Sequence, residues 1–128
     1  MDTIAVGAVS NVFYFVADLA GASAWYRQLL GAEPRTTMPQ LVEFDVGGSV
    51  LTLHANDEFN AGGTGIGTVA YWTTPDVNRA VAVCVARGGT VHRGPKTVFS
   101  GDRLCQVLDP FGNLLGLRQP AAEPPARP

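Results

Sequence analysis

The chain has 128 residues, with nine Lys+Arg against eleven Asp+Glu and a formal net charge of −2. This length suits one domain, or two small modules that share a core. Hydrophobic residues make up 46% of the chain and charged residues 16%, which excludes an intrinsically disordered protein. The charge also lacks the basic excess of a nucleic-acid-binding protein.

No apolar run approaches the roughly 20 residues that span a bilayer, and Met1-Asp2-Thr3 places no basic region before an apolar stretch. We therefore expect neither a membrane span nor a secretory signal, and a cytoplasmic location. Cys84 and Cys105 form no C-x-x-C motif, so we expect them to be reduced core residues.

The first module is predicted over residues 9–55. Residues 9–16 are rich in β-branched and aromatic side chains, which predicts a strand. Asp18 then precedes a segment of helical periodicity that ends at Gly31. Period-two patterning follows, and the pair Gly47-Gly48 predicts a hairpin; the extended pieces cover residues 35–37, 41–46 and 50–54.

A glycine-rich linker is predicted over residues 56–65, and the second module over residues 66–119. This module repeats the order of the first, with a strand over 66–73 and a helix from Asp76 to Gly88-Gly89. Extended segments follow over 90–98, 103–108 and 114–118. The proline-rich tail, residues 121–128, is predicted to be disordered.

The duplication can be tested by position. Asp18, Ala22 and Gly31 recur 58 residues later as Asp76, Ala80 and Gly89, and residues 44–53 are matched with residues 108–117, 64 positions on. Neither module has enough chain to close a core alone. The predicted fold is therefore α+β, with two paired βαβββ modules that form one curved mixed sheet around a concave cavity and helices on the outer face. We expect a single domain over residues 1–120.

These motifs resemble the vicinal oxygen chelate superfamily, which includes glyoxalase I, extradiol dioxygenases and bleomycin-resistance proteins. The resemblance is carried by NVFYFVADL at 11–19, AWYRQLLG at 24–31, DVNRA at 76–80 and DPFGN at 109–113. It implies a divalent-metal site at Asn11, Thr52, Val69 and Gly116. Because Val69 and Gly116 offer no side-chain ligand, we expect no metal and no other cofactor, as in the bleomycin-resistance-like branch.

Strand alternation from these positions predicts which side chains line the concave face. The predicted ligand-binding residues are Asn11, Phe13, Phe15, Val42, Phe44, Thr52, His54, Tyr71, Leu104 and Gln106. Apolar rings with a few polar groups are typical of a small-molecule pocket, although such rings also fill ordinary cores. Tyr14 and Trp72 are predicted on the opposite face, under the helices or at a subunit contact.

The leading functional hypothesis is metal-independent sequestration of a hydrophobic or aromatic small molecule, such as an antibiotic, by a protein that is not an enzyme. The resemblance implies a homodimer, and we expect no nucleic-acid or membrane partner. The alternative is a metal-independent isomerase, cyclase or lyase of secondary metabolism, with His54 as general base. A third hypothesis is a structural or regulatory protein whose core is filled.

Overall fold

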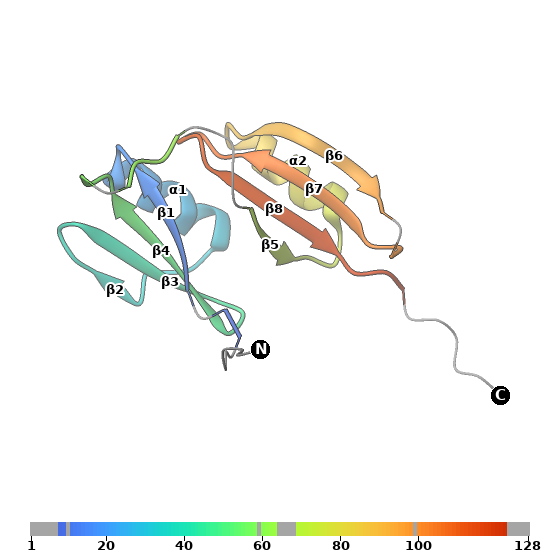
Figure 1. The fold of residues 1–128 in the computed structure, drawn as a ribbon, viewed down its shortest axis with the longest axis horizontal. Coiled ribbons are helices and arrows are strands. Elements are labelled where there is room, and N and C mark those ends of the chain that lie inside the picture. Colours follow the sequence, from blue (N-terminus) through green and yellow to red (C-terminus); the bar gives the residue numbers. More distant parts are fainter. Residues whose placement is uncertain (1–7, 10, 59, 64–68, 99, 123–128) are drawn as a thin grey trace, which may run out of the picture. The chain divides into compact units, whose positions relative to one another are not determined.

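A computed structural model describes residues 8–9, 11–58, 60–63, 69–98 and 100–122. The chain divides into two compact units, residues 1–61 and residues 62–128. The division falls inside the predicted linker. Among its described residues, each unit holds one helix and one four-stranded sheet, whose elements are labelled in Figure 1. The α+β class and the two βαβββ modules are thereby confirmed, whereas the first part of the predicted strand 66–73 lies outside the described residues.

The first unit contains strand β1 (Asn11–Val16), helix α1 (Leu19–Leu30) and strands β2 (Thr36–Thr37), β3 (Leu41–Val46) and β4 (Ser49–Ala55). The strand order is β1-β4-β3-β2, in which β1 runs parallel to β4 and the other pairs are antiparallel. Gly47 and Gly48 have φ values of 53° and 89°, which suit the two-residue hairpin turn that the Gly-Gly pair predicted.

Helix α1 forms where the sequence predicted it. The Asp18 side chain accepts a hydrogen bond from the Gly21 amide at 2.9 Å, and Gly31 ends the helix in the left-handed conformation at φ 62°. Ala22 and Tyr26, one turn apart, are fully buried. Tyr26 contacts Tyr14 of β1 with 6.0 Å between ring centroids, so the helix packs on the face of the sheet that carries Tyr14.

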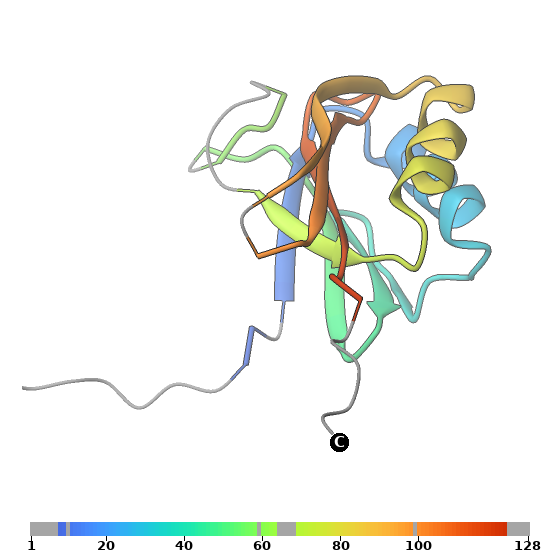
Figure 2. The same cartoon turned by 90° about the vertical axis from the view of Figure 1, so that its right-hand side faces the viewer.

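The second unit contains β5 (Ala70–Thr73), α2 (Val77–Ala86), β6 (Thr90–Thr97), β7 (Arg103–Leu108) and β8 (Leu114–Gln119). Its order, β5-β8-β7-β6, repeats that of the first unit. Asp76 caps α2 by accepting from the Arg79 amide at 3.1 Å, and the Gln119 side chain accepts from the Val77 amide at 2.9 Å. Figure 2 shows α2 on one side of its sheet.

The core of the second unit lies between α2 and its sheet. Its buried apolar residues include Val77, Val81 and Cys84 of α2 and Cys105, Val107, Leu115 and Leu117 of the sheet. Cys84 and Cys105 are free thiols, as the sequence predicted, and burial raises the pKa of both. Within the described residues, neither helix is long and apolar enough to cross a membrane.

The sheet registers confirm the internal repeat but correct its alignment. Val12 pairs with Leu51, and Ala70 pairs with Leu115, so β1 and β4 recur at offsets of 58 and 64 residues. Strand β3 recurs at 63 residues, because Phe44 pairs with Leu51 and Val107 pairs with Leu115. The connection between β7 and β8 contains one residue more than the connection between β3 and β4, because Leu108 pairs with Leu114 where Asp45 pairs with Val50. The gapless match of residues 44–53 with 108–117 is therefore wrong along β3.

Candidate functional site

The face of each sheet opposite its own helix is here called the open face. In the first unit the register across β1, β4 and β3 aligns Phe13 with Thr52 and Glu43, and aligns Phe15 with His54 and Leu41. Directly aligned residues project from the same face of a sheet. Because Tyr14 and Val16, which alternate with them, are buried on the helix side, Phe13, Phe15 and His54 lie on the open face.

Three aromatic rings gather on this face. Phe13 lies 6.0 Å from Phe15 and 6.1 Å from His54 between ring centroids, and Phe15 lies 5.3 Å from His54. These separations are typical of interacting rings. Phe13 lies on β1, the strand at one edge of this sheet, and its side chain is 49% exposed, which is a large exposed fraction for a phenylalanine. We refer to Phe13, Phe15 and His54 as the ring cluster.

The hydrogen bond of His54 fixes the roles of its two nitrogens. Nδ1 lies 2.6 Å from the carbonyl oxygen of Ala55. A carbonyl oxygen only accepts, so Nδ1 carries the proton of this bond and the neutral imidazole has its lone pair on Nε2. The partly buried His54 therefore presents a proton acceptor next to two aromatic rings.

Two of the predicted ligand-binding residues lie on the helix side of the sheet and not on the open face. Val42 pairs with Leu53 and Phe44 pairs with Leu51, and all four side chains are buried on the helix side. Val42 also lines a groove against α1. The prediction that Val42 and Phe44 share the face of Phe13 is wrong, because the Gly47-Gly48 turn sets the pairing of β3 one residue away from the assumed register.

The observed pairing of β3 with β4 also places the carboxylate of Glu43 on the open face. Glu43 aligns with Thr52, so it lies across β4 from Phe13. The sequence reasoning missed Glu43, although the alternation Val42-Glu43-Phe44-Asp45 of apolar with acidic residues contained the signal. Asn11, which alternation places on the face of Phe13, is exposed at the start of β1. Thr52 has the predicted orientation but is fully buried, and within the described residues its hydroxyl has no hydrogen-bond partner.

On the open face of the second unit, Tyr71 aligns with Gly116 and Gln106 across β5, β8 and β7. The Gln106 side-chain amide donates a hydrogen bond to the Tyr71 hydroxyl oxygen at 2.8 Å. A β-carbon at Gly116 would lie 2.7 Å from the Tyr71 ring and from the Ala70 carbonyl oxygen. The absence of a side chain at Gly116 therefore lets the Tyr71 ring lie across β8.

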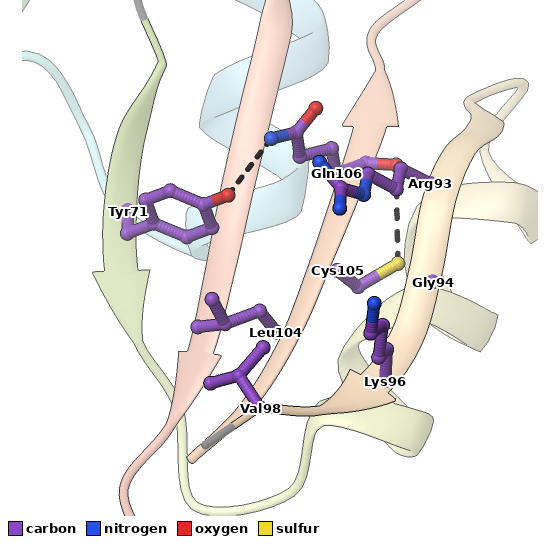
Figure 3. Close-up of a pocket in the computed structure, with 8 residues that line it drawn as sticks. All are labelled: Tyr71, Arg93, Gly94, Lys96, Val98, Leu104, Cys105 and Gln106. Atoms are coloured by element: carbon purple, nitrogen blue, oxygen red, sulfur yellow. Dashed lines mark hydrogen bonds between the residues drawn. The ribbon is translucent and has the colours of Figure 1, made fainter. Parts of the chain in front are cut away.

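A pocket of about 100 Å³ lies beside this pair, and Figure 3 shows the residues that line it. Its lining includes the three predicted ligand-binding residues of the second unit, Tyr71, Leu104 and Gln106, with Val98 and Cys105. Arg93, Gly94 and Lys96 of β6 complete the lining and were not predicted. Tyr71 is 41% exposed, so one side of the pocket presents an accessible aromatic ring.

An ion pair borders the same face. Arg118 Nε donates to Asp102 at 2.7 Å, and the Ala121 amide donates to the same carboxylate at 2.8 Å. The backbone hydrogen bond from Ala121, followed by that from Arg118, holds the pKa of Asp102 below its ordinary value of 3.8. Arg103, the neighbour of Asp102 in the chain, donates instead to Thr97 and Asn78.

The four positions that the resemblance assigns to a divalent cation do not suit one. Val69 is a hydrocarbon, and the space beside Gly116 is occupied by the Tyr71 ring. Asn11 and Thr52 offer neutral oxygens, and the Thr52 hydroxyl is fully buried. Divalent cations of this kind need several converging carboxylate, imidazole or carbonyl ligands. No group of three or more His, Cys, Asp or Glu side chains suited to a metal occurs among the residues that the structure describes.

A family model matches most of the sequence. The model of the Glyoxalase/Bleomycin resistance protein/Dioxygenase superfamily matches residues 8–117. The chain belongs to this superfamily. No curated protein is similar enough in sequence to count as a relative. The resemblance expected from the motifs is thus confirmed at the level of the superfamily, which hosts many activities.

Solved structures confirm the glyoxalase fold. A protein from Agrobacterium tumefaciens solved by NMR is 21% identical with a TM-score of 0.77, covering 91% of this chain and 100% of its own. A lactoylglutathione lyase from Agrobacterium tumefaciens is 22% identical with a TM-score of 0.70, covering 90% and 95%. A glyoxalase/bleomycin resistance protein/dioxygenase family enzyme from Burkholderia phytofirmans is 22% identical with a TM-score of 0.72, covering 86% and 96%.

Proposed function

We propose that this glyoxalase-superfamily protein binds a hydrophobic aromatic small molecule without a metal, and acts by sequestering it. The observation that carries the proposal is the ring cluster, in which Phe13 keeps 49% of its surface exposed on the open face. An exposed ring supported by two others offers a flat apolar contact for an aromatic ligand. An antibiotic is one ligand of this chemistry.

The donor chemistry of the four cation positions favours a metal-independent mode. Affinity then comes from apolar area, and orientation from sparse polar groups such as Asn11 and the Nε2 atom of His54. Capture requires no bond to form or break in the ligand. By resemblance, we propose that two chains pair as a homodimer, whose mass in solution can be measured by light scattering.

Thermal denaturation with a neutral aromatic probe, naphthamide, tests the proposal. A ligand at 100 times its Kd adds about 2.7 kcal/mol of stability. We expect naphthamide to raise the Tm, chelator to leave this shift unchanged, and Phe13→Ala to remove it. Met38→Ala is the matched control, because Met38 belongs to the same unit and is 45% exposed. A shift that survives Phe13→Ala, or that chelator abolishes, overturns the proposal.

His54 supports a second candidate, a metal-independent isomerase, cyclase or lyase. Its Nδ1 is held by the Ala55 carbonyl oxygen, and the free lone pair of Nε2 is the acceptor that proton abstraction requires. Incubation of the protein with bound ligand, followed by mass spectrometry and NMR of the ligand, separates the two candidates. Conversion that His54→Ala abolishes supports an enzyme, whereas recovery of unchanged ligand supports sequestration.

A further inference from the structure

The two units carry opposite charge. Residues 62–128 contain seven of the nine Lys+Arg but four of the eleven Asp+Glu, and residues 1–61 contain the remaining two and seven. The net charge of −2 is thus the sum of an acidic first unit and a basic second unit. The field of a basic unit favours anionic ligands near its surface.

A bulge in β6 places two of these cations in the pocket beside Tyr71. Arg93 aligns with Gln106 and Lys96 aligns with Leu104, so a step of three residues on β6 faces a step of two on β7. In a regular strand, residues three apart point to opposite faces. The extra residue brings Arg93 and Lys96 to the same face, the open face of Gln106 and Leu104.

Gly94 makes this bulge possible. Its φ is 84°, and a β-carbon there would lie 2.6 Å from the Leu104 carbonyl oxygen. Only glycine combines this conformation with so close an approach to the neighbouring strand. The backbone conformation at Gly94 therefore places Arg93 and Lys96 on the side of the pocket, so their position does not depend only on the flexibility of their long side chains.

The carboxylates of the second unit are engaged elsewhere. Among its described residues, Asp76 caps α2, Asp102 binds Arg118, and Asp109 accepts the Phe111 and Asn113 amides of the turn. No ion pair involves Arg93 or Lys96 within the part of the chain that the structure describes. The hydroxyl of Tyr71 accepts from Gln106, which leaves its own hydrogen available to an acceptor in the pocket.

We propose that this pocket binds the carboxylate of a small aromatic acid. Arg93, Lys96 and the Tyr71 hydroxyl donate to the carboxylate, and Leu104, Val98 and the Tyr71 ring contact its apolar part (Figure 3). At about 100 Å³ the pocket is smaller than the 300–1,000 Å³ that encloses a drug-sized molecule, so it takes one end of the ligand. The inference rests on the proposed function in that the ligand is an aromatic small molecule.

The test compares three probes that share one ring system and differ in charge: naphthoate, naphthamide and naphthylmethylammonium. Binding is measured by NMR titration of the intact chain, with the side-chain amide of Gln106 as the local reporter. We expect naphthoate to bind about tenfold more tightly than naphthamide, and to shift the resonances of Arg93, Lys96 and Gln106. We expect the ammonium compound to bind most weakly. Added salt should weaken the binding of naphthoate and leave that of naphthamide unchanged.

Charge-removing variants locate the effect. Arg93→Gln and Lys96→Gln are each expected to weaken naphthoate about tenfold, because each removes one charged donor. Arg79→Gln is the matched control, since Arg79 is an exposed arginine of α2 in the same unit and does not line the pocket. Both pocket variants should fold, because these side chains are exposed and hold no ion pair among the described residues.

The outcomes separate the two proposals. Equal binding of naphthoate and naphthamide, or equal losses in Arg93→Gln and Arg79→Gln, overturns the carboxylate pocket. If the carboxylate pocket is overturned in this way but Phe13→Ala still abolishes naphthamide binding, the proposed function stands without the carboxylate pocket. Acetate that binds as tightly as naphthoate overturns the aromatic part of the ligand. Failure of all three naphthyl probes to bind overturns both proposals.

Discussion

Truncation of two phenylalanines of the first unit tests the face assignment on which the site depends. Phe44 is fully buried against α1, whereas Phe13 is 49% exposed on the open face. Loss of a fully buried phenylalanine side chain costs about 3–5 kcal/mol. Half-burial of a comparable ring is worth roughly 1 kcal/mol by area. We therefore expect Phe44→Ala to destabilise the protein about three to five times more than Phe13→Ala.

Urea denaturation measures the difference. With an m value of about 2 kcal/mol per molar, Phe44→Ala should lower the midpoint by roughly 2 M and Phe13→Ala by roughly 0.5 M. A Trp72→Phe background leaves Trp25 of α1 as the fluorescent reporter, so the signal comes from the first unit. Phe44→Ala should also leave the ring cluster in place, whereas Phe13→Ala removes its exposed member.

Equal losses of stability in the two variants would refute the reasoning. Such a result would mean that Phe13 is as deeply buried as Phe44, and that no accessible ring is present on the open face. A larger loss in Phe13→Ala than in Phe44→Ala would show that the pairing of β3 with β4 differs by one residue from the register described above.

Two further predictions concern the second unit. Gly116→Ala places a β-carbon 2.7 Å from the Ala70 carbonyl oxygen and the Tyr71 ring, so it should lower the free energy of unfolding by about 1–3 kcal/mol and move the Gln106 side-chain amide resonance in NMR spectra. An unchanged resonance would contradict the described packing of Tyr71. Because its folded-state pKa is lowered, Asp102 stabilises the fold above pH 3.8 and loses this effect as the pH falls through the lowered pKa. Asp102→Asn should therefore be less stable than the natural protein at neutral pH, with the difference in urea midpoint shrinking below pH 3.8; a constant difference would contradict the stabilising role of the carboxylate.

Local sequence determined the elements and their ends. Asp18 and Asp76 cap the helices because their short carboxylates reach the free amides of the first turn, and Gly31 ends α1 because it adopts a positive φ without strain. The duplicated order of strand, helix and three strands follows from the same local signals. It was sufficient to identify the fold and to place Tyr71, Leu104 and Gln106 on one face of the second sheet.

Tertiary structure decided which side chains meet. The face of the sheet on which the Val42 and Phe44 side chains lie depends on the pairing of β3 with β4. A shift of one residue in this pairing moves both side chains to the opposite face. Alternation along a single strand does not reveal that pairing. Arg93 and Lys96 lie on the same face of the sheet only because β6 bulges where it pairs with β7. The hydrogen bonds of Asp102 to Arg118 and Ala121 depend on the path of the chain along and after β8. These contacts join residues on different strands or distant in sequence. They are therefore determined by how whole strands pair and pack, and not by the local conformational preferences of single residues.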